Sequence, residues 1–178
     1  LGNPDNENDG VEAGAAFLYD VAFPTAAIAY PSQTAFMNSL DAFRGDVLDP
    51  DPGVSGEIEP AGVAAVEISV QQMLDGKFFN GTGYSGTLRS WFTANLFLNA
   101  AGSTGTWSFS AADDPEMFSA LSSGRYSVTA RARDRAGNEQ YNFLGNSSSF
   151  TFTVDKDTPS VAVAAPNQNH RYYTPLLA

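Results

Sequence analysis

Residues 124–138, GRYSVTARARDRAGN, carry the clearest structural pattern in the chain. From position 126 to position 133, apolar and polar side chains alternate, which is the two-residue period of a β-strand with one buried face. The expected buried face holds Tyr126, Val128, Ala130 and Ala132, and the opposite face holds Ser127, Thr129, Arg131 and Arg133. The turn-forming residues Ala136, Gly137 and Asn138 follow directly. The stretch therefore predicts a half-buried strand that runs into a tight turn.

Strands of the same kind are expected on both sides of this stretch. The segment AAVEISVQQM at 64–73 alternates apolar and polar residues, and SFTFTV at 149–154 does the same. Four further strands are expected, namely TAAIAY at 25–30, SLDAFRGDVL at 39–48, WFTANLFL at 91–98 and TWSFS at 106–110. In DDPEMFSALSSG at 113–124, an Asp, a Pro and a Glu in succession predict the start of a short helix. Short strands separated by turns predict an all-β fold, an antiparallel two-sheet sandwich with at most one short helix.

The chain also contains an internal repeat. Residues 17–33 recur in register at residues 152–168, with seven identities in seventeen positions and an offset of 135 residues. The identical pairs are Phe17 with Phe152, Asp20 with Asp155, Pro24 with Pro159, Ala27 with Ala162, Ala29 with Ala164, Pro31 with Pro166 and Gln33 with Gln168. Both copies combine a strand end, an acidic turn, a proline and a new strand, which is typical of a joint between modules. We therefore expect an acidic tail and a last-strand-like segment at 1–19, one sandwich module at 20–158, and the start of a next module or a linking strand at 159–178.

Composition argues against several classes of function. Twenty acidic residues against nine basic ones give a net charge of −11, whereas nucleic acids and anionic membrane surfaces bind basic proteins. The chain has no cysteine, which rules out disulfides, thiolate metal sites and cysteine nucleophiles. The single histidine, His170, lies in the second joint, so a serine nucleophile has no convincing base and we expect no enzyme. No apolar run predicts a membrane span, and any targeting or anchoring signal is expected outside this sequence.

Three stretches resemble bacterial immunoglobulin-like repeat domains, which occur in large secreted and cell-surface proteins of the adhesin type. They are the pattern G-x-Y-x-V-x-A-x-A-x-D-x-A-G-N at 124–138, the joint VDKDTP at 154–159 with Pro166, and LDAFRGDVLDPDPGVSGEIEPAGVAAVEISVQ at 40–71. The resemblance implies an immunoglobulin-like sandwich outside the cell, commonly repeated in tandem and often stiffened by calcium. It also implies that Tyr126 is a tyrosine corner, whose hydroxyl binds the backbone near the start of its strand.

Calcium is the ligand that the acidic turns favour, because it binds several oxygen atoms from carboxylates and carbonyls. Two groups of candidate ligands follow. The first group is Asp134, Asn138, Asp155 and Asp157, where an ion would couple neighbouring modules at the second joint. The second group is Asp46, Asp49 and Asp51, in the acidic loop before Val54. The alternative is that these side chains only bind their own backbone in turns.

Eight aromatic residues in the middle of the chain allow two interpretations. They either form a platform that stacks on sugars or fill the core between the sheets, as aromatic residues do in most sandwiches. The eight are Phe78, Phe79, Tyr84, Trp91, Phe92, Phe97, Trp107 and Phe109. We expect most of them in the core.

The function expected from these features is mechanical. The chain is interpreted as a non-catalytic extracellular module, a spacer or adhesin segment of a repetitive bacterial or archaeal surface protein, with neighbouring copies of the same module as its partners. A first alternative is a self-assembling filament or surface-layer subunit, in which GAAFLYD at 14–20 or VAVAAP at 161–166 completes a neighbour's sheet by strand addition. A second alternative is a carbohydrate-binding accessory module of a secreted hydrolase, with a cell-surface glycan as its partner.

Overall fold

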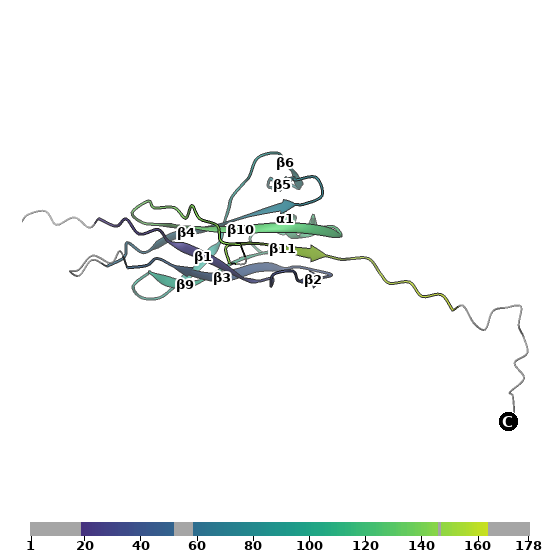
Figure 1. Ribbon diagram of the computed structural model, residues 1–178, viewed down its shortest axis with the longest axis horizontal. Helices are drawn as coiled ribbons and strands as arrows, with labels where there is room; N and C mark the ends of the chain where they lie inside the picture. Colours follow the sequence, from purple (N-terminus) through teal and green to yellow (C-terminus); the bar gives the residue numbers. More distant parts are fainter. Residues whose placement is uncertain (1–18, 52–58, 146, 164–178) are drawn as a thin grey trace, which may run out of the picture.

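The computed structural model describes residues 19–51, 59–145 and 147–163. Within them, two β-sheets pack face to face with one short helix, so the predicted all-β two-sheet sandwich is confirmed (Figure 1). The first sheet has the order β1 (Thr25–Tyr30), β3 (Ala42–Leu48), β9 (Thr104–Ser110) and β8 (Asn95–Leu98). The second sheet has the order β2 (Phe36–Met37), β11 (Ser149–Val154), β10 (Gly124–Asp134), β4 (Val63–Gln72), β5 (Phe78–Phe79) and β6 (Tyr84–Gly86), and β7 (Phe92–Thr93) also pairs with β4. Every pairing between these strands is antiparallel except that of β2 with β11.

Strand β10 lies in the middle of the second sheet, and it is the strand predicted from residues 124–138. It pairs with β4 along most of its length and with β11 along its first half. All four side chains expected on the inner face are buried. On the outer face, Arg131 forms an ion pair of 2.8 Å with Glu67, its direct neighbour on β4. The predicted alternation of faces is therefore confirmed, together with a cross-strand partner for the arginine.

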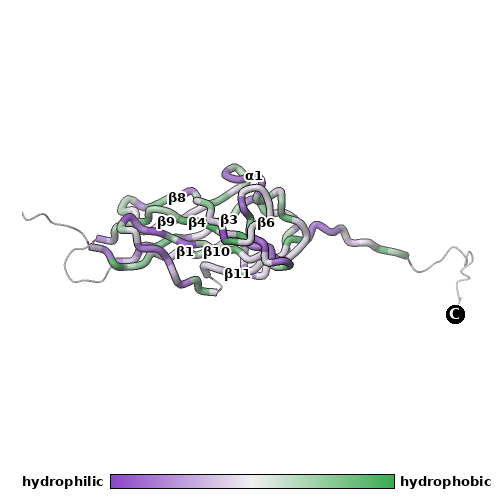
Figure 2. Tube along the Cα trace, turned by 90° about the horizontal axis from the view of Figure 1, so that it is seen from above, coloured by the Kyte–Doolittle hydropathy of each residue, from purple (hydrophilic) through white to green (hydrophobic). Residues whose placement is uncertain are grey.

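The inner faces of both sheets form one core. Its largest fully buried side chains are Trp107, Tyr126, Phe43, Phe79 and Phe152. Figure 2 shows the hydrophobic stretches running along the strands between the hydrophilic loops. Five of the eight aromatic residues considered above contribute to this core: Phe79, Trp107 and Phe109 are buried, and Tyr84 and Phe92 pack against it. The expectation that most of them are core residues is thus confirmed.

The segment WFTANLFL was predicted as one strand, and this prediction is wrong. The structure divides it at Ala94 into β7, which pairs with β4 in the second sheet, and β8, which pairs with β9 in the first. The Ala94 N–H donates to Val66 O at 2.8 Å, which holds the crossing point between the sheets. Both inner faces point to the same core, so a strand that changes sheet keeps its alternation of apolar and polar residues. Hydrophobic periodicity alone therefore does not reveal the switch.

The predicted short helix is α1 (Pro115–Ser119). Its first turn is capped by the Asp114 carboxylate, which accepts a hydrogen bond of 3.0 Å from Met117 N–H. With five residues, this helix is well short of the length that crosses a bilayer.

The predicted tyrosine corner lies close to this helix. The Tyr126 hydroxyl donates to Ser122 O at 3.2 Å and accepts from Ser122 N–H at 3.0 Å. This pair of bonds fixes the chain where it enters β10, which is the structural role expected of Tyr126.

The outer edge of β1 is covered by the chain that follows β10. The side-chain oxygen Oε1 of buried Gln140 accepts a hydrogen bond of 2.8 Å from Ala26 N–H, and Ser147 O accepts one of 2.9 Å from Ile28 N–H. These bonds occupy donors that would otherwise be open to another strand. Strand β1 is therefore held on one side by β3 and on the other by Gln140 and Ser147.

The chain enters and leaves the sandwich at opposite ends of its long axis. The lead segment (residues 19–24) reaches β1 at one end, and the exit segment (residues 155–163) leaves β11 at the other (Figure 1). Of the two segments considered for strand addition, residues 14–18 and 164–166 lie outside the described residues. The described part of the second one, residues 161–163, is exposed and forms no strand.

Candidate metal centre

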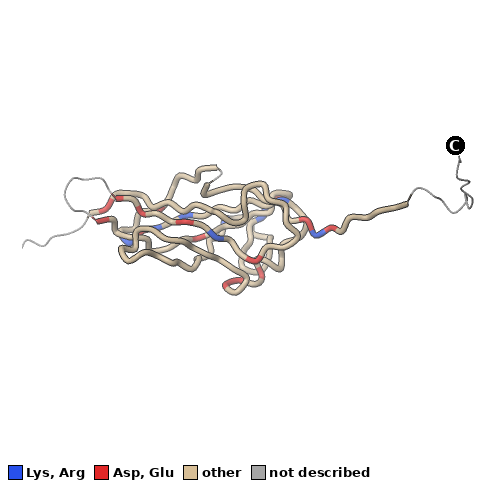
Figure 3. Tube along the Cα trace, turned by 90° about the horizontal axis from the view of Figure 1, so that it is seen from below, with Lys and Arg blue, Asp and Glu red and all other residues tan. Residues whose placement is uncertain are grey.

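Three buried carboxylates meet at the end of the sandwich where the lead segment enters. Asp20 belongs to the lead segment, Asp49 follows β3 directly, and Asp134 is the last residue of β10. Each offers a carboxylate oxygen within 4.8 Å of the other two, and the residues are only 7%, 1% and 2% exposed, respectively. We call these three residues the Asp triad. Figure 3 shows acidic residues in red at this end of the sandwich.

The antiparallel pairing explains why residues so far apart in sequence meet. Thr25, the first residue of β1, pairs with Leu48, the last residue of β3. In the other sheet, Val63 at the start of β4 pairs with Asp134 at the end of β10. The ends of β3 and β10 therefore lie beside the starts of β1 and β4, and the triad joins both sheets to the incoming chain.

Backbone N–H groups orient the carboxylates of Asp20 and Asp49. Asp20 Oδ1 accepts from Ala22 N–H at 2.8 Å, and its Oδ2 accepts from Ala61 N–H at 2.7 Å. Asp49 Oδ2 accepts from Gly62 N–H at 2.7 Å. Gly62 has φ +88°, a conformation that favours glycine, so the sequence Ala61–Gly62 is suited to present two successive N–H groups to the site.

Asn138 holds the third carboxylate in place. Its N–H donates to Asp134 Oδ1 at 2.8 Å, and its amide Nδ2 donates to Asp134 Oδ2 at 2.7 Å and to the backbone oxygen of Asp20 at 3.0 Å. Because the amide nitrogen faces two acceptors, the orientation of this amide is fixed. Asn138 thus acts here as a donor that ties Asp134 to the lead segment.

One oxygen of the triad has no hydrogen-bond partner. Oδ1 of Asp49 is buried, and no described residue donates a hydrogen bond to it. Burial, the largest effect, raises the pKa of Asp49 above its usual value; the Gly62 hydrogen bond lowers it, and the nearby charges of Asp20 and Asp134 raise it further. Among the described residues, the direct ion pairs are those of Arg131 with Glu67 and Glu139, and none of them involves a carboxylate of the triad.

This arrangement can hold a metal ion. Buried charges in proteins are normally paired or bind metals, because an uncompensated charge away from water is costly. Three carboxylates in reach of one point supply the oxygen ligands that hard cations prefer. The triad is therefore a candidate metal centre. Asp49 Oδ1, which is buried and accepts no hydrogen bond from a described residue, is the first candidate ligand atom.

The two groups of candidate ligands expected from the sequence are rearranged in the structure. Asp49 and Asp134 come together although they were placed in different groups, and Asn138 lies beside them. The missing third carboxylate, Asp20, was not among the expected ligands, yet the repeat had singled it out as the counterpart of Asp155.

The remaining expected ligands lie elsewhere. Asp155 and Asp157 follow Val154, which pairs with Gly124 at the start of β10, so they lie at the opposite end of the sandwich from Asp134. Asp46 is not in a loop but within β3, where it is exposed and pairs with Thr106. Asp51 is exposed just beyond Asp49. The expected grouping of Asp134 with Asp155 and Asp157 is corrected accordingly, because antiparallel β10 and β11 carry their neighbouring acidic turns to opposite ends.

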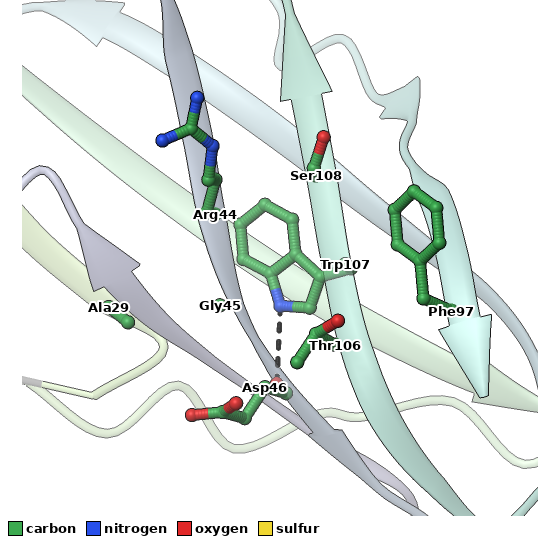
Figure 4. A pocket seen from close by; sticks show the side chains of 8 residues that line it. All are labelled: Ala29, Arg44, Gly45, Asp46, Phe97, Thr106, Trp107 and Ser108. Carbon is green, nitrogen blue, oxygen red and sulfur yellow. Dashed lines mark hydrogen bonds between the residues drawn. The ribbon is translucent and has the colours of Figure 1, made fainter. Parts of the chain in front are cut away.

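A second concave feature lies on the first sheet. This hollow has a volume of about 470 Å³ and is lined by residues of β3, β8 and β9 and by Ala29. Figure 4 shows the side chains that line it. The ring of Trp107 lies against Gly45, where a Cβ atom would come within 2.8 Å of the indole, and Trp107 Nε1 donates to Ala27 O and Asp46 O. Trp107 is fully buried, so its ring offers no face for stacking on a sugar, and Phe97 is the exposed aromatic residue of the hollow.

The other tryptophan is covered by charged side chains. The guanidinium of Arg131 lies 4.3 Å from the centre of the Trp91 ring, and that of Arg89 lies at 5.3 Å. The ring of Phe143 stacks beside it at 6.1 Å. Trp91 therefore belongs to a cation–π cluster on the outer face of the second sheet.

Comparisons with known proteins leave the family open. No family model matches the chain, and no curated protein matches its sequence. Among solved structures, the chain is similar to CopC from Methylosinus trichosporium OB3b, with 17% sequence identity and a TM-score of 0.39 over 75% of this chain and 93% of that chain. At this identity and score, the likeness concerns the β-sandwich fold and nothing more.

Proposed function

We propose that the chain is a non-catalytic structural module of an extracellular protein, in which a calcium ion bound by the Asp triad fastens the incoming chain to the sandwich. The observation that carries this proposal is the buried, unpartnered Oδ1 of Asp49 beside two further buried carboxylates. The three ligands come from the lead segment, the first sheet and the second sheet. One ion bound there would cross-link all three.

Calcium suits this set of ligands better than other common metals. Zinc prefers histidine and cysteine, whereas the chain has no cysteine and the three ligands of the triad are all carboxylates. Magnesium demands a strict octahedral geometry and keeps most of its water, while calcium accepts carboxylates in irregular positions. Water and backbone carbonyls would supply its remaining ligands.

The position of the triad favours a mechanical role. Tension on the ends of the module would act along its long axis, because the chain enters at one end and leaves at the other (Figure 1). Asp20 lies just ahead of β1, so an ion at the triad would resist the withdrawal of β1 from its place between β3 on one side and Gln140 and Ser147 on the other. This use of calcium agrees with the resemblance of residues 124–138 to bacterial immunoglobulin-like repeat domains.

An extracellular setting fits the expected affinity as well. Extracellular modules typically bind calcium with dissociation constants of about 10⁻⁴ to 10⁻³ M, which sites with few protein ligands reach. We infer that the module is a spacer or adhesin segment whose stiffness depends on the calcium around it.

Thermal unfolding with and without calcium tests the proposal. At a calcium concentration of about 100 times the dissociation constant, binding should stabilise the fold by about 2.7 kcal/mol, which raises Tm by about 5 to 10 °C for a chain of this size. Asp134→Asn should abolish this rise. Asp46→Asn is the matched control, because it removes an exposed carboxylate of β3 that is not part of the triad. Equal rises in Tm for both variants would contradict the proposed site.

A further inference from the structure

The structure places the two copies of the sequence repeat in different surroundings. With the offset of 135 residues, the exit segment 155–163 corresponds to residues 20–28, which form the end of the lead segment and most of β1. Asp155 corresponds to Asp20 and Pro159 to Pro24. Residues 20–28 lead into the sandwich and form part of its first strand, whereas residues 155–163 follow its last strand.

The two copies share the same local turn. Asp20 Oδ1 accepts a hydrogen bond of 2.8 Å from Ala22 N–H, two residues ahead. Asp155 Oδ1 accepts one of 3.0 Å from Asp157 N–H, also two residues ahead. Asp20 additionally accepts from Ala61 N–H through Oδ2, whereas among the described residues no second donor reaches Asp155. The exit segment therefore repeats the Asp turn of the lead segment without the second hydrogen bond that Asp20 accepts.

Burial separates the two copies. Ala26 and Ile28 alternate on the inner face of β1, where they are 1% and 8% exposed. Their counterparts Val161 and Val163 alternate in the same way but are 94% and 77% exposed. Figure 2 shows the hydrophobic end of the exit segment well away from the sandwich. Two valines at core positions of a strand pattern, both in water, indicate a strand that lacks its sheet.

We propose that the exit segment is the first strand of a following module of the same fold, into whose core Val161 and Val163 insert, and whose cation site Asp155 completes. In that module Asp155 would take the place of Asp20. The valines would occupy the positions of Ala26 and Ile28, beside the strand that corresponds to β3. The part of this proposal that concerns the cation rests on the proposed function above.

The receiving module is one that follows in the same polypeptide, and not a second free copy of this chain. In a free copy, the position beside β3 is already filled by its own β1, whose outer edge is bonded to Gln140 and Ser147. A following module would have no first strand of its own other than this segment. In a following module, the position beside the strand that corresponds to β3 would therefore be open to the exit segment.

The joint between two such modules would be short and stiff. The Asp155 N–H donates to Met37 O at 2.8 Å, so the backbone of Asp155 is bound to the module described here. Its carboxylate would bind the cation of the next module. A single residue would thus be attached to both modules, with no linker between them.

A tandem protein tests this inference. It consists of residues 1–168 followed by residues 34–178 of a second copy, which keeps the 135-residue spacing and leaves residues 155–168 as the only first strand for the second unit. The expected result is two folded units, seen as a calorimetric unfolding enthalpy about twice that of the single chain, because this enthalpy scales with the number of folded residues. It also predicts two calcium sites in place of one.

Three variants of the tandem protein separate the parts of the inference. Val161→Asp combined with Val163→Asp should return the enthalpy to that of one unit, whereas Ser160→Asp, at the counterpart of exposed Thr25, should not. Asp155→Asn should leave both units folded and remove one calcium site. An enthalpy of one unit in the unchanged tandem, or one that is indifferent to the two valine substitutions, would overturn the inference. Two folded units with no calcium bound would instead contradict only the proposed function and the cation part of this inference.

Discussion

Residues 20–28 and residues 155–163 begin with the same acidic turn and continue with the same alternation of apolar residues, yet only the first stretch is built into a sheet. The comparison separates what a sequence specifies locally from what needs a partner. The Asp turn forms in both copies because its hydrogen bond lies within three residues. The strand forms only in the first copy, because a β-strand is stabilised by neighbours distant in the sequence.

The largest difference is expected from truncation of the inward-facing residues. Ile28→Ala should destabilise the chain by about 2 to 5 kcal/mol, because it leaves a cavity in the core. Val163→Ala, at the corresponding position of the exit segment, should change the free energy of unfolding by less than about 0.5 kcal/mol. Urea unfolding of both variants measures this contrast. Similar losses would mean that the exit segment packs against its own module.

A smaller contrast is expected between the two aspartates. Asp20→Asn should remove most of the stabilisation by calcium, about 2.7 kcal/mol at 100 times the dissociation constant. Asp155→Asn should leave that stabilisation intact in the single chain, because Asp155 lies at the opposite end of the sandwich from the Asp triad. Tm measured in calcium and in chelator distinguishes the two. If Asp155→Asn lost the stabilisation by calcium, the ion would bind at the end of the sandwich opposite the Asp triad, which would contradict the proposed site.

The smallest expected effect concerns the metal-free protein and its dependence on pH. The pKa of Asp49 is raised in the folded chain, so its stabilising contribution is present below the usual value of 3.8 and is lost as the pH rises through the raised pKa. Asp49→Asn should lack this loss and should therefore be more stable than the unchanged chain at neutral pH without metal, by about 1 to 3 kcal/mol. The same substitution should make the protein indifferent to calcium.

Urea unfolding in chelator at a series of pH values measures this effect. Asp155→Asn serves as the comparison, because Asp155 is exposed and lies at the opposite end of the sandwich from the Asp triad. If the free energy of unfolding of the unchanged chain and of Asp49→Asn depended on pH in the same way, the charge of Asp49 would not destabilise the metal-free fold.

Much of the fold could be predicted because its signals are local. The alternation around Tyr126 and the Asp114, Pro115 and Glu116 sequence predict β10 and α1 without reference to the rest of the chain. The change of sheet at Ala94 could not be predicted, since the alternation of buried and exposed residues is the same on both sides of it. Strands of two or three residues, such as β2 and β6, are too short to show any period.

The candidate site could be predicted only in pieces. Asp49 and Asp134 were both expected as ligands because each follows a strand in an acidic turn, but a sequence does not state which turns meet. Proximity in the chain suggested Asp155 as the neighbour of Asp134, and the antiparallel course of β11 carries it away. The sequence repeat pointed to the third ligand, because it pairs Asp20 with Asp155, which was an expected ligand.

Calorimetric titration of the metal-free chain with calcium is the most decisive experiment on the Asp triad. We expect one calcium ion to bind per chain, and none to bind to Asp49→Asn under the same conditions. Absence of binding at millimolar calcium, or unchanged binding by Asp49→Asn, would contradict the claim that the Asp triad is a calcium site.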